Sequence, residues 1–191
     1  MQAQLSRESQ HYTAKVKIMD STLTRLARMA LTGIVLGLLS ACANMADTPP
    51  GTPLHQVEAK FGQANFSCPA ENGGQRLIWS QQPYGQYAWG ANVNSAGITD
   101  RIEPLLTDKH FNVLATGVWT PERVRCEFGP PAEITQVGLP SSVQTVWSYR
   151  YKQSGAWNSL MYVYFGKTGE AVTRFHPGPD PLYERESFWF N

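Results

Sequence analysis

Side chains that could do acid–base chemistry are few and scattered in this sequence. Asp100 lies in a short predicted strand at residues 98–102 and Glu103 directly follows it, and the two could face one another as the paired carboxylates of glycoside hydrolases do. The hairpin pattern around them favours a solvated sheet edge instead. His55, His110 and His176 are widely spaced and form neither an HxxxH nor an HExxH zinc pattern. We therefore expect no catalytic residues, no metal site, no cofactor and no enzymatic activity.

The composition of the chain excludes further classes of function. The 191 residues include 16% charged side chains and carry a formal net charge of +1. A nucleic-acid-binding domain usually has a clear basic excess, so we expect no nucleic-acid partner. Neither a GxSxG nucleophile motif nor the GxGxxG and GxxxxGK[ST] phosphate-binding motifs occur. A 12% aromatic content is enough to build a packed core.

The N-terminal segment has the pattern of an export signal. Arg25 and Arg28 precede an uncharged apolar stretch at residues 29–39. A basic region before 7–15 apolar residues is typical of a secretory signal peptide. Eleven helical residues extend only about 16 Å, roughly half of a bilayer core, so a mature membrane-spanning helix is not expected. Met19 and Met29 are alternative starts to Met1.

The apolar stretch ends in Leu39-Ser40-Ala41-Cys42, which resembles the bacterial lipobox. That resemblance implies that the signal is removed before Cys42 and that Cys42 carries the lipid modification, a membrane anchor. Ala43 follows Cys42 in place of the aspartate that marks inner-membrane retention. The resemblance thus implies an outer-membrane lipoprotein that faces the periplasm.

Two cysteines remain after residue 42, Cys68 and Cys126. An oxidising periplasm permits a disulfide between them. Two separate, partly buried thiols are the alternative, and the sequence leaves both open. Neither cysteine lies in a CxxC motif, so a redox or metal-binding role has no support.

The rest of the chain contains one module twice. Residues 52–62 and 120–129 each predict a short helix with Thr at the N-cap, Pro in the first turn and Gly just past the end. Trp79 and Trp147 follow the two helices at an offset of 68 residues, and a predicted hairpin comes after each Trp. The second hairpin is predicted to have strands at residues 160–165 and 170–175. We expect the two tryptophans to mark the cores of two small modules.

This pattern resembles the SmpA/OmlA (BamE-like) outer-membrane lipoprotein domain. Phe128-Gly129-Pro130-Pro131 and Trp147-Ser148-Tyr149 carry the resemblance in the second copy. A tandem pair is also similar to the β-lactamase inhibitor protein fold. The resemblance implies an α+β fold of two tandem modules, each a short helical segment packed on a three- to four-stranded antiparallel sheet. The expected organisation is a signal peptide, a lipidated tether, two modules and a tail, at residues 1–41, 42–51, 52–112, 113–178 and 179–191.

Aromatic residues alternate along two predicted strands of the second module and suggest a contact surface. Tyr149 and Tyr151 lie on one strand, and Tyr162 and Tyr164 lie on the next. Since Tyr is favoured at interfaces, we predict that these four side chains contribute to partner binding. Packing between the two modules is the alternative.

Two classes of function follow. The first is a lipid-anchored, non-enzymatic scaffold or binding lipoprotein with a periplasmic or outer-membrane protein partner, in outer-membrane protein or envelope assembly. The second is an inhibitor- or sensor-type protein that binds a periplasmic enzyme or a cell-wall ligand.

Overall fold

The computed structural model describes residues 44–70 and 73–187 of the chain. The predicted signal peptide, the Leu39–Cys42 motif and the last four residues lie outside the described residues. Among the residues that are described, no helix is both long enough and apolar enough to cross a bilayer.

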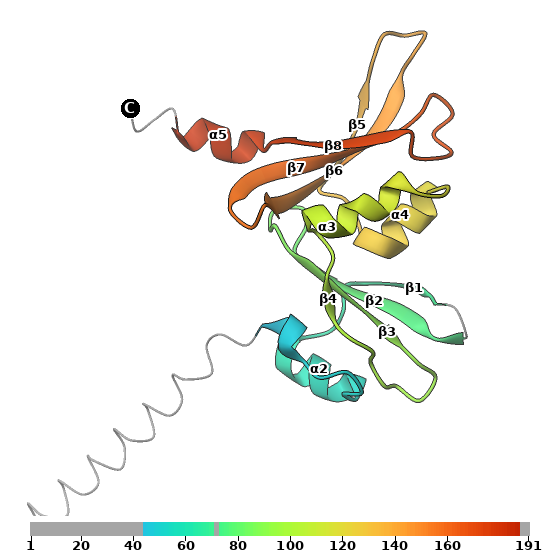
Figure 1. Ribbon diagram of the computed structural model, residues 1–191, viewed down its shortest axis with the longest axis vertical. Helices are drawn as coiled ribbons and strands as arrows, with labels where there is room; N and C mark the ends of the chain where they lie inside the picture. The colour runs from blue at the N-terminus through green and yellow to red at the C-terminus, as the bar shows by residue number, and fades with distance from the viewer. Residues whose placement is uncertain (1–43, 71–72, 188–191) are drawn as a thin grey trace, which may run out of the picture. The chain divides into compact units, whose positions relative to one another are not determined.

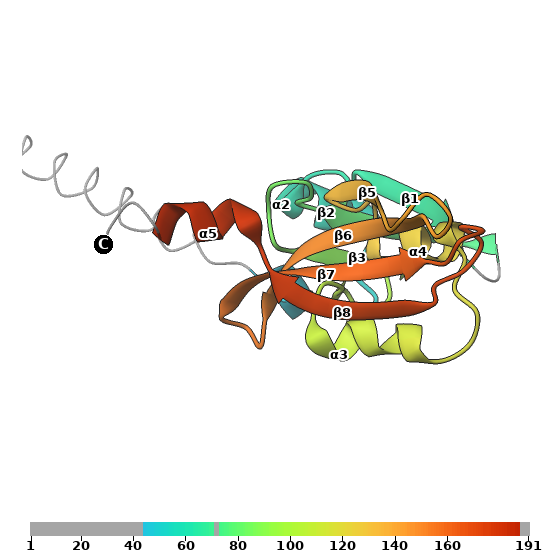
Figure 2. The ribbon, with the colours of Figure 1, turned by 90° about the horizontal axis from the view of Figure 1, so that it is seen from above.

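Two antiparallel sheets of four strands dominate the structure, and within each sheet consecutive strands are neighbours (Figures 1 and 2). The first sheet contains β1 Phe66–Pro69, β2 Gln75–Ser80, β3 Ala88–Val93 and β4 Glu103–Pro104. The second contains β5 Glu133–Val137, β6 Gln144–Gln153, β7 Trp157–Phe165 and β8 Arg174–Pro179. With the short helices beside them, the sheets form an α+β fold of two modules, which confirms the expected fold class.

The helices within the described part of the chain are short. The first module has a 3-10 turn, η2 Met45–Asp47, and the helix α2 Leu54–Phe61. Three more segments lie between the last strand of the first sheet and the first strand of the second: α3 Asp108–Phe111, η4 Asn112–Ala115 and α4 Pro121–Phe128. The helix α5 Pro181–Ser187 follows the last strand.

The predicted capping pattern is confirmed for α4 but not for α2. In α4 the Thr120 hydroxyl accepts a hydrogen bond from the Arg123 N–H at 3.3 Å, and Gly129 ends the helix with a φ of 83°. α2 starts one residue later than expected, with Pro53 at its N-cap and no side-chain cap. The Thr52 hydroxyl instead donates to the Pro49 carbonyl at 2.6 Å, so the two helix starts are not equivalent.

The two cores are also unequal, because the first sheet contributes to both. Leu77 and Trp79 of β2 lie in a small core beneath α2, together with Val57. Ile78 points to the opposite face of the same strand and lies in a larger core. That larger core joins α3, α4 and the second sheet, and it includes Trp147. Figure 1 shows α3 and α4 between the two sheets.

Both tryptophans are therefore core residues as expected, one in each core, but the two cores are not equivalent, because the larger one also contains residues of the first module. The boundary predicted between residues 112 and 113 falls inside the continuous helical segment 108–115. Phe111 and Leu114, on either side of that boundary, both lie in the larger core. The chain from Asn44 onward forms one compact unit.

Cys68 of β1 and Cys126 of α4 are joined by a disulfide, with their Cα atoms 5.9 Å apart. The bond links the first sheet to a helix of the second module and closes a loop across 58 residues. A loop of that length corresponds to about 4 kcal/mol of stabilisation on the chain-entropy model.

We therefore expect the double variant Cys68→Ser/Cys126→Ser to lower the free energy of unfolding by about 2–5 kcal/mol. Urea denaturation measures the loss, and dithiothreitol supplies the control: it should destabilise the wild type and leave the double variant unchanged. A double variant within 1 kcal/mol of the wild type would contradict a stabilising disulfide.

Candidate binding surface

The four tyrosines predicted to form a contact surface lie on opposite faces of the second sheet. Tyr149 and Tyr151 alternate with Trp147 along β6, so all three side chains point to the same face. That face covers the larger core, and both tyrosines are fully buried. The prediction that Tyr149 and Tyr151 contribute to a contact surface is therefore wrong.

Both buried tyrosines have hydrogen-bond partners inside the protein. The Tyr149 hydroxyl donates to the Gly129 carbonyl at 3.1 Å, and the Tyr151 hydroxyl donates to Oδ1 of Asp108 at 2.9 Å. Burial raises the pKa of both hydroxyls, and the Asp108 carboxylate raises that of Tyr151 further. These two rings hold the end of α4 and the start of α3 against the sheet.

Tyr162 and Tyr164 lie on the other face of the sheet, where β8 adds two further side chains. Tyr162 pairs with His176, and Tyr164 pairs with Arg174. The His176 ring lies 5.6 Å from the Tyr162 ring and 5.4 Å from the Tyr164 ring, between centroids. The Arg174 guanidinium lies 3.8 Å from the centre of the Tyr164 ring. We call these four residues the Tyr-His-Arg face.

Local contacts fix the orientation of these rings. Nδ1 of His176 lies 3.2 Å from the Pro177 carbonyl, and Nε2 lies 3.1 Å from the Tyr164 hydroxyl. Because a carbonyl only accepts, neutral His176 donates from Nδ1 and accepts from Tyr164 at Nε2. A Cβ atom at Gly178 would lie 2.9 Å from the Tyr162 ring, so this glycine makes room for the ring on the sheet.

The Tyr-His-Arg face combines half-buried rings with an exposed cation and an exposed imidazole. Burial, with the negative charge of Asp180 nearby, raises the pKa of the Tyr162 hydroxyl, so it stays neutral at physiological pH. Rigid aromatic rings with an Arg at the side are the residue types that dominate protein–protein contacts. The arrangement can bind a partner by packing and hydrogen bonding.

Arg174 and His176 were missed by the sequence reasoning, although a signal for them existed. The predicted strand ended at Phe175, whereas β8 runs to Pro179. Extending the alternation by one residue would place Arg174 and His176 on one face and Phe175 on the other. Phe175 does pack against the larger core.

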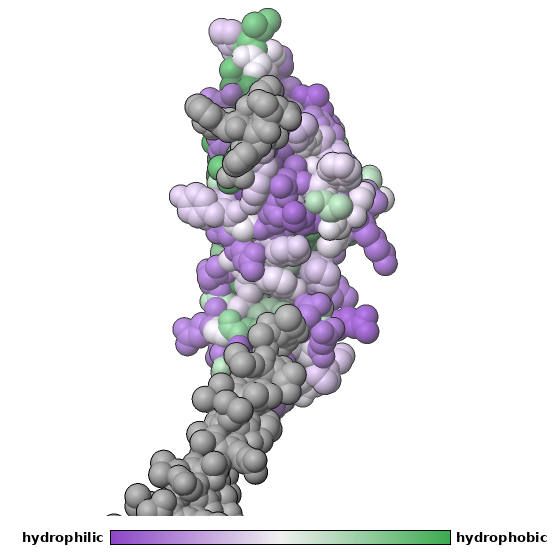
Figure 3. Space-filling model, turned by 90° about the vertical axis from the view of Figure 1, so that its left-hand side faces the viewer, coloured by the Kyte–Doolittle hydropathy of each residue, from purple (hydrophilic) through white to green (hydrophobic). Residues whose placement is uncertain are grey.

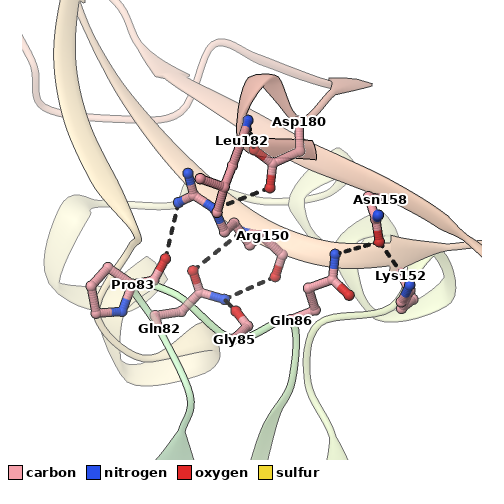
Figure 4. Close-up of polar contacts among 9 residues, drawn as sticks. All are labelled: Gln82, Pro83, Gly85, Gln86, Arg150, Lys152, Asn158, Asp180 and Leu182. Carbon is pink, nitrogen blue, oxygen red and sulfur yellow. Dashed lines mark hydrogen bonds and ion pairs between the residues drawn. The ribbon is translucent and has the colours of Figure 1, made fainter. Parts of the chain in front are cut away.

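A cluster of polar contacts joins the loop at residues 81–87 to the second sheet (Figure 4). The Gln82 side chain donates to the Arg150 carbonyl at 2.8 Å and accepts from the Arg150 N–H at 3.2 Å. The Arg150 guanidinium donates to the Pro83 carbonyl at 2.9 Å and pairs with the buried Asp180 carboxylate at 3.0 Å. Asp180 also accepts from the Leu182 N–H at the start of α5. Since these polar groups satisfy one another, we assign this cluster a structural role.

Exposed aromatic side chains lie on the loop at residues 81–87 and at the start of β7. Tyr84 and Tyr87 of the loop are 80% and 45% exposed, and Trp157 at the start of β7 is 73% exposed. Gln86 and Asn158, one residue from Tyr87 and Trp157, are joined at 2.7 Å (Figure 4). We call Tyr84, Tyr87 and Trp157 the loop aromatics.

The structure does not bring the candidate acid–base residues together. Asp100 accepts two hydrogen bonds from Asn92, and it lines a different groove from Glu103. The groove beside Glu103 has a volume of about 450 Å³ and is also lined by His110. Nε2 of His110 lies 2.6 Å from Oε1 of Glu127. Burial alone would raise the pKa of Glu127, but this hydrogen bond and the nearby cations lower it overall.

The third of the candidate histidines, His55, is exposed on α2. Within residues 44–70 and 73–187, no group of three His, Cys, Asp or Glu side chains is placed to hold a metal ion.

Comparisons with known proteins add little to this geometry. No family model matches the sequence, and no curated protein matches it. Among solved structures, a DUF4309 family protein, YjgB, from Bacillus subtilis matches 72% of this chain and 86% of its own, at 15% identity and a TM-score of 0.26.

Proposed function

We propose that this protein is a lipid-anchored, non-enzymatic binding lipoprotein of the outer membrane that faces the periplasm and takes part in outer-membrane protein or envelope assembly. The lipobox-like Leu39–Cys42 motif supports the anchor and the location. The resemblance of the tandem modules to SmpA/OmlA domains supports the role in assembly. The proposal implies two kinds of partner, the membrane through its lipid and a periplasmic or outer-membrane protein.

The Tyr-His-Arg face is the observation that carries the binding function. It presents two tyrosines, a histidine and an arginine on a rigid antiparallel sheet, outside the core. The side chains are held by one another before a partner arrives, so little conformational entropy is lost on binding. A packed aromatic contact with few charges should depend only weakly on salt.

The double variant Tyr162→Ser/Tyr164→Ser tests this surface. We expect it to reduce recovery of the partner at least about tenfold in affinity purification after mild detergent extraction, because loss of a central ring commonly costs 2 kcal/mol or more of binding. Thermal melts should show that the fold survives. Recovery equal to wild type from a folded variant would place the binding surface elsewhere.

The second candidate function is an inhibitor- or sensor-type protein that binds a periplasmic enzyme or cell-wall ligand. The loop aromatics favour it, since exposed rings on two adjoining turns suit insertion into a cleft. Tyr84→Ser is the matched control in the same purification. It leaves recovery unchanged if the sheet face binds the partner, and it abolishes recovery if the loops do. Recovery of a soluble enzyme or of cell-wall fragments, in place of outer-membrane proteins, would support the second function.

A further inference from the structure

The four edge strands of the two sheets are not equally protected against pairing with another strand. Proline cannot donate a backbone hydrogen bond, and proteins place it on sheet edges to prevent such pairing. Three edges carry it: β1 contains Pro69, β4 contains Pro104, and β8 contains Pro177 and Pro179. The fourth edge, β5, has the sequence Glu-Ile-Thr-Gln-Val and contains no proline.

β5 is open along its free side. Among the described residues it pairs only with β6, and four of its five residues are exposed. Glu133 is the one charged residue of β5, and residues 134–149 include no charged side chain, so the like-charge repulsion that protects many edges is weak here. An edge strand of this kind can add a strand from another chain by backbone hydrogen bonding.

We propose that the β5 edge binds β5 of a second copy of this protein, antiparallel and about a two-fold axis at Thr135. In that register Thr135 lies opposite Thr135 of the second copy, a favourable cross-strand pair. Glu133 lies opposite Val137 and not opposite a second Glu133, so the only charges on the strand are kept apart. Ile134 lies opposite Gln136. The two four-stranded sheets join into one sheet of eight.

The β5–β6 hairpin leaves this edge accessible. Figure 1 shows the hairpin extending beyond the helices, and Figure 3 shows hydrophobic residues at the end of the molecule to which it points. Val137, Leu139 and Val143 around its turn are 40%, 73% and 36% exposed. Leu139 and Val143 extend the apolar surface beyond the paired strands. Because β5 has only five residues, we expect the contact to be smaller than the roughly 1,200–2,000 Å² of a standard interface, so the dimer is weak and depends on concentration.

Sedimentation of the full chain in mild detergent, with micelles in excess over protein, tests the proposal. The wild type should show a concentration-dependent dimer. Thr135→Lys should raise its dissociation constant at least about tenfold, because it sets two like charges directly opposite each other at the two-fold axis. Ser67→Lys, which puts the same charge at an exposed position of the proline-containing edge strand β1, should leave the dimer unchanged. A wild type that stays monomeric, or a Thr135→Lys dimer as tight as wild type, would overturn the proposal.

Oxidative cross-linking tests the register. Thr135→Cys should form a disulfide-linked dimer, since its two thiols meet at the axis. Gln136→Cys, one residue along and opposite Ile134, should cross-link far more slowly. Equal rates would contradict this register. Capture of a different protein by Thr135→Cys in cells, with no self-linked dimer, would overturn the second copy as the occupant in favour of a strand from that protein.

Discussion

Replacing Phe128 by alanine is expected to lower the free energy of unfolding by about 3–5 kcal/mol, the usual cost of removing a large side chain from a core. The Phe128 ring is completely buried at the end of α4. It stacks on Phe111 with 4.9 Å between ring centroids, and it contacts Tyr149 at 5.9 Å and His110 at 5.4 Å. These neighbours come from α3 and β6, so the cavity would open where both elements meet α4.

Phe61→Ala is the matched control, because Phe61 takes the place of Phe128 in the first copy of the repeat. Phe61 is only partly buried at the edge of the smaller core. We expect Phe61→Ala to cost clearly less than Phe128→Ala in urea denaturation. A loss below 1 kcal/mol for Phe128→Ala, or equal losses for the two variants, would contradict the unequal cores described above.

Capping and turn residues predicted the elements whose geometry depends only on neighbouring residues in the sequence. The Thr120 cap, Pro121 in the first turn and the positive φ at Gly129 define α4 from adjacent residues alone. The same signals misplaced the start of α2, because Thr52 hydrogen-bonds backwards to Pro49. A cap residue can bond on either side, and only the surrounding chain decides between them.

Strand lengths and faces were harder to predict. Residues 98–102 read as a strand, but only isolated bridges form at Ile98 and Thr99, and β4 is limited to Glu103–Pro104. The alternation along each strand showed that Tyr149 and Tyr151 point to the same face of the sheet, and likewise Tyr162 and Tyr164. It could not show which face is covered, because that depends on where α3 and α4 pack.

Contacts between distant residues could not be predicted from one sequence. Gln82 and Arg150 are 68 positions apart, and neither lies in a motif. Cys68 and Cys126 were recognisable as a candidate pair only because so few cysteines occur. Tyr162 and Tyr164 were predicted from their alternating positions along one strand. His176 and Arg174 lie beside them because β8 pairs with β7 in this register, which one strand alone does not show.

The lipid anchor at Cys42 is the central claim of the proposed function, and labelling of cells with a fatty-acid probe tests it most directly. Leu39-Ser40-Ala41-Cys42 supplies the one thiol at which the lipobox pattern places the modification. Wild-type protein should take up the probe and fractionate with the outer membrane, whereas Cys42→Ala should lose the label completely. The double variant Cys68→Ser/Cys126→Ser, which alters the other two thiols, should label like wild type. Equal labelling of wild type and Cys42→Ala, or no labelling of either, would contradict the anchor.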